Sequence, residues 1–177
     1  LFRMNKHLRY AETDKMSELI CENYKLLLVM SRFGLSLGFG DQTVKQVCEQ
    51  QGVHTGTFLA VVNFMEDECC VPESYREDIS VEAFVDYLRR GHSYFLDFNL
   101  PVIRRKLIDA IDCSRDDVAF LILKFFDAYV NEVRAHMEYE NEVVFKYVYA
   151  LLEGREAGDY SIGVFAARHN QIETKLT

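Results

Sequence analysis

The segment from Ser114 to Gly154 constrains this chain most, because its apolar residues recur at the spacing of one long helix. Residues three or four apart on a helix share a face, so the face turned toward a core should be one apolar stripe. Two polar residues, His136 and Glu140, interrupt that stripe. The predicted inward seam consists of Val118, Ile122, Phe125, Tyr129, Val133, His136, Glu140, Val143 or Val144, Tyr147 and Leu151.

An inward-facing histidine and carboxylate cost several kcal/mol unless another group compensates them. A bound metal ion would do so. The spacing His136-x-x-x-Glu140 is a weak signal by itself, because a lone histidine on an apolar face is usually satisfied by neighbouring protein groups. The metal interpretation therefore needs further ligands at the same level.

A second long helix is predicted from Ser80 to about Ile111, with a kink at Pro101, one turn past His92. If the two helices form a hairpin, His92 lies about 29 Å and His136 about 32 Å from the turn. A last helix after Ser161 carries His169, and the loop before it can bring His169 into the same layer. Imidazole and carboxylate ligands without thiolates suit iron, manganese or zinc, and helical bundles commonly hold such sites.

The N-terminal part is predicted to be a small helical domain. Its helices cover residues 14–33, ended by Gly34, then a helix capped by Asp41 or by Thr43 and closed by Gly52, then about 57–67. The stretch Thr43-Val-Lys-Gln46 fits a capping box. Residues 44–61 have the spacing of a helix-turn-helix, but the second helix lacks Lys and Arg for phosphates or bases. The sequence therefore favours a module that packs on itself or on a partner over DNA binding.

A polar linker at residues 68–79, which contains Pro72, marks the predicted domain boundary. We thus expect an all-α protein with a small domain at residues 1–72 and a bundle at residues 78–177. The net charge of -8 excludes general attraction to nucleic acid or anionic lipid, and no run of eighteen apolar residues predicts a membrane span. The odd number of five cysteines favours reduced thiols in the cytoplasm.

Residues 80–177 resemble the hemerythrin-like (HHE cation-binding) domain, in particular that of the iron-sulfur cluster repair di-iron proteins. The stretch Gly91-His-Ser-Tyr-Phe-Leu-Asp-Phe-Asn-Leu-Pro101 is similar to the family's first ligand helix. The stretch His136-Met-Glu-Tyr-Glu140, with Phe145 five residues on, is similar to the second, and Arg168-His169-Asn170 to the third.

This resemblance implies an up-down helical bundle in which His92, His136, Glu140 and His169 bind one or two iron ions, with Glu140 as a candidate bridge. It also implies iron handling for iron-sulfur cluster repair, or a response to oxygen or nitric oxide, with iron-sulfur proteins as partners. An iron-binding repair or sensor protein is favoured over a conventional enzyme.

Two features depart from the family. Its fourth helix supplies another His-x-x-x-Glu, which has no counterpart before Thr177, so we expect a fragment, a homodimer that completes the site, or a degenerate site. Glu173 is either a partial substitute or an ordinary glutamate. The pair Cys69-Cys70 lacks the glycine of the family's cysteine motif and is not assigned the family's role, so it is either a redox or metal site or, as the sequence favours, two ordinary thiols. The alternatives are a helix-turn-helix regulatory or adaptor protein with a metal-sensing bundle, and a purely structural helical protein.

Overall fold

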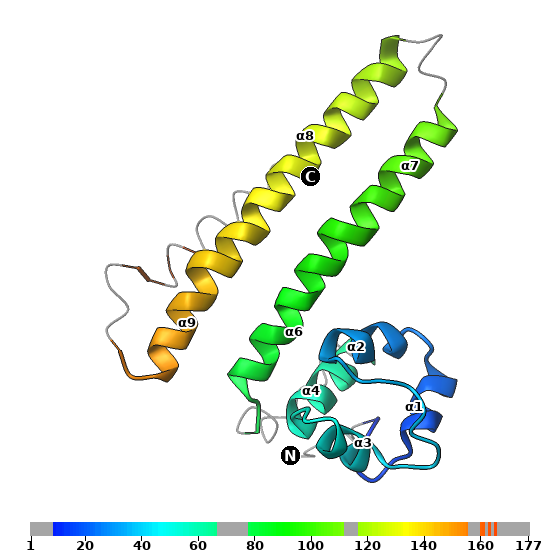
Figure 1. Cartoon of the computed structure of the whole chain (residues 1–177), viewed down its shortest axis with the longest axis vertical. Helices are drawn as coiled ribbons and strands as arrows, with labels where there is room; N and C mark the ends of the chain where they lie inside the picture. Colours follow the sequence, from blue (N-terminus) through cyan, green and yellow to red (C-terminus); the bar gives the residue numbers. More distant parts are fainter. Residues whose placement is uncertain are drawn as a thin grey trace, which may run out of the picture. The chain divides into compact units, whose positions relative to one another are not determined.

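The computed structural model describes residues 9–66, 78–111 and 117–155, together with residues 160, 161, 163 and 165. These residues form helices and contain no strand beyond an isolated bridge between Lys15 and Thr43, so the all-α prediction is confirmed for this part of the chain (Figure 1). The helical elements are α1 (Met16–Glu22), α2 (Leu26–Phe33), α3 (Val44–Gln50), α4 (Thr55–Glu66), α6 (Val81–Tyr94), the π-helical turn η1 (Phe95–Asn99), α7 (Leu100–Ala110), α8 (Asp117–Tyr139), the π-helical turn η2 (Glu140–Val144) and α9 (Phe145–Leu152).

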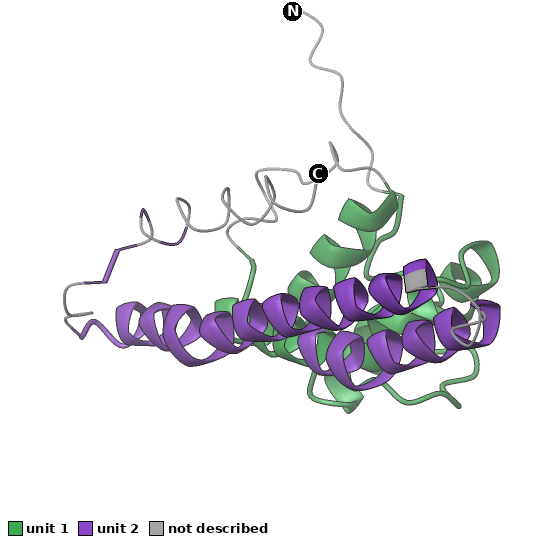
Figure 2. Ribbon diagram, turned by 90° about the horizontal axis from the view of Figure 1, so that it is seen from above, with its two compact units in different colours: residues 1–91 green, residues 92–177 purple. Residues whose placement is uncertain are grey.

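The chain divides into two compact units, Leu1–Gly91 and His92–Thr177, which Figure 2 colours separately. The division falls inside α6, whereas the sequence places the domain boundary in the linker before that helix. Most of the linker lies outside the described residues, so the boundary at residues 68–79 stays a prediction. Tyr87 explains why the first turns of α6 belong to unit 1: its ring stacks on Phe33 at a centroid distance of 4.7 Å.

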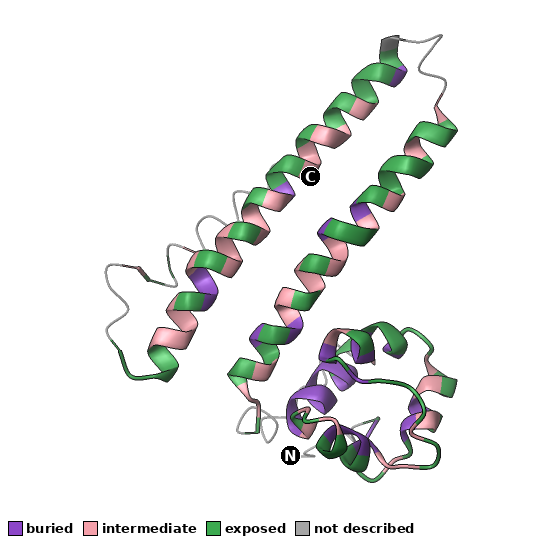
Figure 3. Ribbon diagram, in the orientation of Figure 1, coloured by how far each residue is buried: buried purple, intermediate pink, exposed green. Residues whose placement is uncertain are grey.

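Unit 1 has a well-packed core around α4. Every residue from Gly56 to Asn63 is buried, and Figure 3 shows this helix as mostly buried. Phe58 is fully enclosed and meets Phe33 edge to face at 5.5 Å. Apolar side chains of α1, α2 and α3 close around these rings.

The single helix predicted at residues 14–33 is wrong, because the structure has two helices with a break at Asn23. The backbone of Asn23 is extended, with φ -139° and ψ 95°. Its side-chain oxygen accepts the N–H of Lys25 at 3.0 Å, and its amide donates to Glu66. Asparagine side chains that bond to nearby backbone groups compete with the helix, which explains the break.

The predicted ends of the neighbouring helices are confirmed. Gly34 closes α2 in the left-handed conformation with φ 78°. Thr43 caps α3 as one half of a capping box: its hydroxyl accepts the N–H of Gln46, whose side chain accepts the N–H of Thr43.

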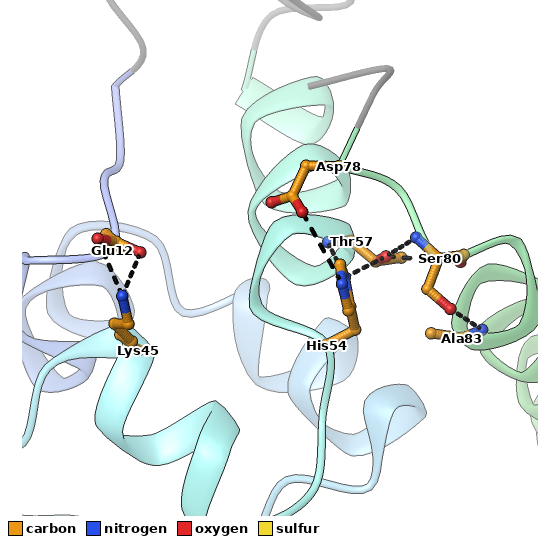
Figure 4. A network of polar contacts seen from close by, with 7 residues as sticks. All are labelled: Glu12, Lys45, His54, Thr57, Asp78, Ser80 and Ala83. Carbon is orange, nitrogen blue, oxygen red and sulfur yellow. Dashed lines mark hydrogen bonds and ion pairs between the residues drawn. The ribbon is translucent and has the colours of Figure 1, made fainter. Parts of the chain in front are cut away.

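A polar cluster joins the start of α6 to the start of α4 (Figure 4). The Thr57 hydroxyl accepts the N–H of Ser80 at 2.9 Å, and Ser80 in turn caps α6 by accepting the N–H of Ala83 at 3.2 Å. His54, predicted to be exposed, is 41% exposed and caps α4, because its Nδ1 accepts the N–H of Thr57. Gly56 permits the close approach, since a Cβ there would lie 2.6 Å from the carbonyl oxygen of Asp78.

In unit 2 the helix that continues from His92 through η1 and α7 runs antiparallel to α8 and α9 (Figure 1). The two antiparallel helical segments pack together through a small hydrophobic core of Leu96, Leu100 and Val133. Outside this core, Arg104 clamps Asp127 with two hydrogen bonds of 2.7 and 2.9 Å. The predicted hairpin is therefore present, and its loop lies outside the described residues.

The inward seam predicted for the first half of α8 is wrong in the described structure. Val118, Ile122 and Phe125 are 59, 44 and 78% exposed. The residues of α8 that pack in the core with the first helix include Phe126 and Val130, together with Tyr129 and Val133 from the second half of the predicted seam. Helical periodicity identifies the apolar face of such a helix. When this face is wide, periodicity does not show which of its edges packs against the neighbouring helix.

Among the described residues, no helix is long and apolar enough to span a bilayer.

Candidate metal centre

Three of the predicted ligands converge between the two long helices of unit 2. His92 Nε2 lies 3.1 Å from Glu140 Oε2, and His136 Nε2 lies 3.0 Å from Glu140 Oε1. The side chains are only 12 to 15% exposed. The predicted alignment of His92 with His136 is confirmed by these distances, whereas the role of the three residues as metal ligands stays a prediction.

The local structure explains how three side chains from distant parts of the sequence meet. His92 lies in the last turn of α6, and His136 lies in the last turn of α8. Glu140 follows His136 by one helical turn, so both project from the same face. Because the hairpin is antiparallel, His92 reaches this level from the other helix.

Each helix carries a π-helical turn next to the site. In η1 the N–H of Leu100 bonds to the carbonyl of Phe95, and in η2 the N–H of Phe145 bonds to the carbonyl of Glu140. The first turn occupies the place where Pro101 predicted a kink, and the helix continues through it (Figure 1). Such π-helical turns are rare and frequently occur at functional sites.

Two further residues of the second helix hold the ring of His92. Asn141 Oδ1 lies 3.0 Å from His92 Nδ1, and the ring of Phe145 stacks on the imidazole at a centroid distance of 5.7 Å. Asn141 was missed in the sequence, because it directly follows Glu140 and successive residues of an α-helix point in different directions. A weak signal was available: an amide next to a predicted ligand is a suitable partner for a histidine ring.

The donor set fits a metal such as iron, manganese or zinc. A nitrogen and an oxygen bound to one ion at about 2.1 Å and at right angles lie about 3.0 Å apart. The two distances around Glu140, 3.0 and 3.1 Å, match that separation. Hydrogen bonds from N–H to oxygen have the same length. The positions of the protons on the two imidazole rings therefore distinguish metal binding from direct hydrogen bonds.

No group of three or more His, Cys, Asp or Glu side chains in the described ranges could hold an ion by itself. The contacts agree with this finding, because each imidazole faces a different oxygen of Glu140. The result is two nitrogen–oxygen pairs that share one carboxylate, and each pair needs additional ligands. The predicted additional ligands, His169 and Glu173, lie outside the described residues.

The cysteines do not contribute to this centre in the described structure. Cys69 and Cys70 lie outside the described residues. Cys21 and Cys48 are free thiols of unit 1, the first exposed and the second buried. Burial raises the pKa of the Cys48 thiol to about 12, which keeps it protonated and unreactive at neutral pH.

The second helix of the helix-turn-helix segment, α4, is largely buried in unit 1. The polar residues of that helix are used internally: Thr57 binds the backbone of Ser80, and Asn63 pairs with both backbone groups of Tyr10 at 3.0 Å. Thr57 is 0% and Asn63 1% exposed. These residues therefore stabilise the unit and are not positioned to contact DNA.

No protein-family model, curated protein or solved structure matches this chain.

Proposed function

We propose that this chain is a non-haem iron protein that binds one or two iron ions at His92, His136 and Glu140. His169 would add a further ligand, and Glu173 is either a partial substitute for other ligands or an ordinary glutamate. One observation supports this proposal most strongly: each oxygen of the Glu140 carboxylate faces the Nε2 atom of a different histidine. Manganese or zinc would bind the same donors in place of iron.

The surroundings of Glu140 support this proposal. The two oxygens of Glu140 would bind one ion each, the bridging role implied by the hemerythrin-like resemblance. Val144 and Phe145 are buried beside it and limit the access of water. A dry, apolar surrounding controls the redox potential and ligand exchange of a bound metal. Bound iron would supply redox chemistry and exchangeable positions for a small ligand such as oxygen or nitric oxide.

Iron handling for iron-sulfur cluster repair, or a response to oxygen or nitric oxide, is the proposed cellular role. It rests on the likeness to the iron-sulfur cluster repair di-iron proteins, which stays a prediction from sequence motifs. The proposed iron-sulfur protein partners rest on the same likeness, whereas the proposed cytoplasmic location rests on the cysteine pattern and the proposed homodimer on the incomplete ligand set. A binding or sensing role is favoured over a conventional enzyme activity.

The proposal is tested by metal analysis of protein purified without air. We expect iron, manganese and zinc together to reach at least one equivalent per chain, and His136→Ala to lose most of it because a ligand is removed. His54→Asn is the matched control: it deletes a histidine of unit 1 and keeps a residue that caps helices well. Under one-tenth of an equivalent in the unaltered protein, or equal metal in His136→Ala, would contradict the proposal.

The regulatory alternative, in which the helix-turn-helix segment binds DNA or a partner, is less well supported. Its second helix, α4, is buried along most of its length, which weighs against insertion into a DNA groove. A partner-binding form is favoured by an apolar cavity of about 490 Å³ between α4 and the start of α6. Phe64 and Met65 at its edge are about half exposed, 46 and 53%.

A further inference from the structure

We propose that Asn141 is a positioning residue for His92: it fixes the proton on Nδ1 and thereby presents the lone pair of Nε2 toward Glu140. This inference deepens the proposed metal site and depends on it for its function. The contact between Asn141 Oδ1 and His92 Nδ1 is 3.0 Å long. No other described contact reaches that nitrogen.

The chemistry of the two groups gives the direction of this hydrogen bond. With Oδ1 facing the ring, Nδ1 donates, because an amide oxygen only accepts hydrogen bonds. In a neutral imidazole one nitrogen carries the proton and the other a lone pair, so Nε2 is left with the lone pair. That lone pair faces Glu140 Oε2, another acceptor, at 3.1 Å.

Two acceptors at this distance repel each other unless a metal ion, or a proton held by either group, lies between them. The arrangement therefore suits a nitrogen ligand and an oxygen ligand of the same ion. Histidines that bind metals typically donate their other N–H to a carboxylate, a carbonyl or water, which fixes the tautomer and the ring orientation. The side-chain carbonyl of Asn141 can serve in this way.

The π-helical turn explains how adjacent residues reach the same ring. Glu140 and Asn141 are the first two residues of η2. In a regular α-helix they would point about 100° apart, too far to share one partner. The wider i to i+5 turn reduces this rotation. Phe145 closes the same turn and stacks on the ring, so Asn141 and Phe145 hold His92 at Nδ1 and on one face.

The reversed orientation of the Asn141 amide predicts the other tautomer of His92, so the inference can be tested. Amide oxygen and nitrogen exchange places on a half-turn of the side chain. If Asn141 donated from Nδ2 to Nδ1, then Nε2 would carry the proton and form an ordinary hydrogen bond to Glu140. The two arrangements differ in which nitrogen is protonated.

The first measurement is nitrogen-15 NMR of His92 in metal-free protein, at a pH where the ring is neutral. We expect the Nδ1–H tautomer in the unaltered protein and its loss in Asn141→Ala. Asn141→Asp should keep it, because a carboxylate also accepts from Nδ1. The Nε2–H tautomer in the unaltered protein, or the same tautomer in Asn141→Ala, would overturn the inference.

The second measurement is titration of Fe(II) without air against a competing chelator. Asn141→Ala should weaken iron binding by about 10- to 100-fold, whereas Asn141→Asp stays within a few-fold. Asn131→Ala, at an exposed asparagine of the same helix, is the control and should leave iron binding unchanged. Affinity within two-fold of the unaltered protein in Asn141→Ala, with only a lower melting temperature, would show a purely structural role.

The two measurements separate this inference from the proposed function. If the unaltered protein binds no iron while Asn141→Ala still changes the tautomer of His92, then the metal proposal fails and the positioning contact stands. If iron binds and Asn141→Ala changes neither the tautomer nor the affinity, then the positioning inference fails and the metal proposal stands.

Discussion

Glu140 is the residue that links the two long helices of unit 2 chemically. Its carboxylate contacts one histidine on its own helix and one on the other. The sequence identified all three residues from periodicity and spacing. It did not identify Asn141, because hydrogen bonding around a π-helical turn leaves no hydrophobic pattern.

The two described cysteines have opposite environments, which gives a prediction about reactivity. Cys48 is fully buried, and burial raises its pKa to about 12, so at pH 8 only about one thiol in ten thousand is ionised. Cys21 is exposed. We expect iodoacetamide at pH 8 to alkylate Cys21 at least about 100-fold faster than Cys48, as followed by peptide mass spectrometry. Equal rates in folded protein would contradict the burial of Cys48, and guanidinium should abolish the difference.

Two apolar residues of α8 lie on the predicted inward seam but differ in burial. The sequence places Phe125 and Val133 on the same inward face, but the structure leaves Phe125 78% exposed and buries Val133 at 8%. We expect Val133→Ala to lower the free energy of unfolding by about 2 kcal/mol and Phe125→Ala to change it by less than about 0.5 kcal/mol. Equilibrium urea unfolding followed by circular dichroism measures both.

A larger loss of stability in Phe125→Ala than in Val133→Ala would contradict the observed burial. A loss of about 3 to 5 kcal/mol in Phe125→Ala, the cost of deleting a buried aromatic ring, would show that its face of α8 is covered in solution. The seam read from the sequence would then be correct for the whole protein, and the exposure of Phe125 in the described structure would be wrong.

For individual helices, local signals in the sequence were reliable where a side chain acts within one turn. The capping box at Thr43 and the left-handed Gly34 are present as predicted. The break at Asn23 was missed because it depends partly on Glu66, which is distant in sequence and bonds to the Asn23 amide. Long-range polar contacts of this kind cannot be read from a local pattern.

For the whole molecule, the class of fold was predictable from the sequence. The arrangement of the helices that carry His92, His136 and His169 was predictable only in part. Helix lengths placed His92 and His136 at one level, because the rise per residue is constant. The position of His169 could not be tested in the same way, since it lies beyond a loop and outside the described residues. The account therefore depends on whether metal binds at Glu140.

Diffraction at the iron absorption edge, from crystals grown without air in the presence of Fe(II), tests that claim most directly. The account predicts an anomalous peak at about 2.0 to 2.3 Å from the carboxylate of Glu140 and from Nε2 of His92 or His136. Two peaks, one beside each imidazole, would indicate a bridged pair of ions. An iron-free site in which both Nε2 atoms keep their direct contacts to Glu140 would contradict the account.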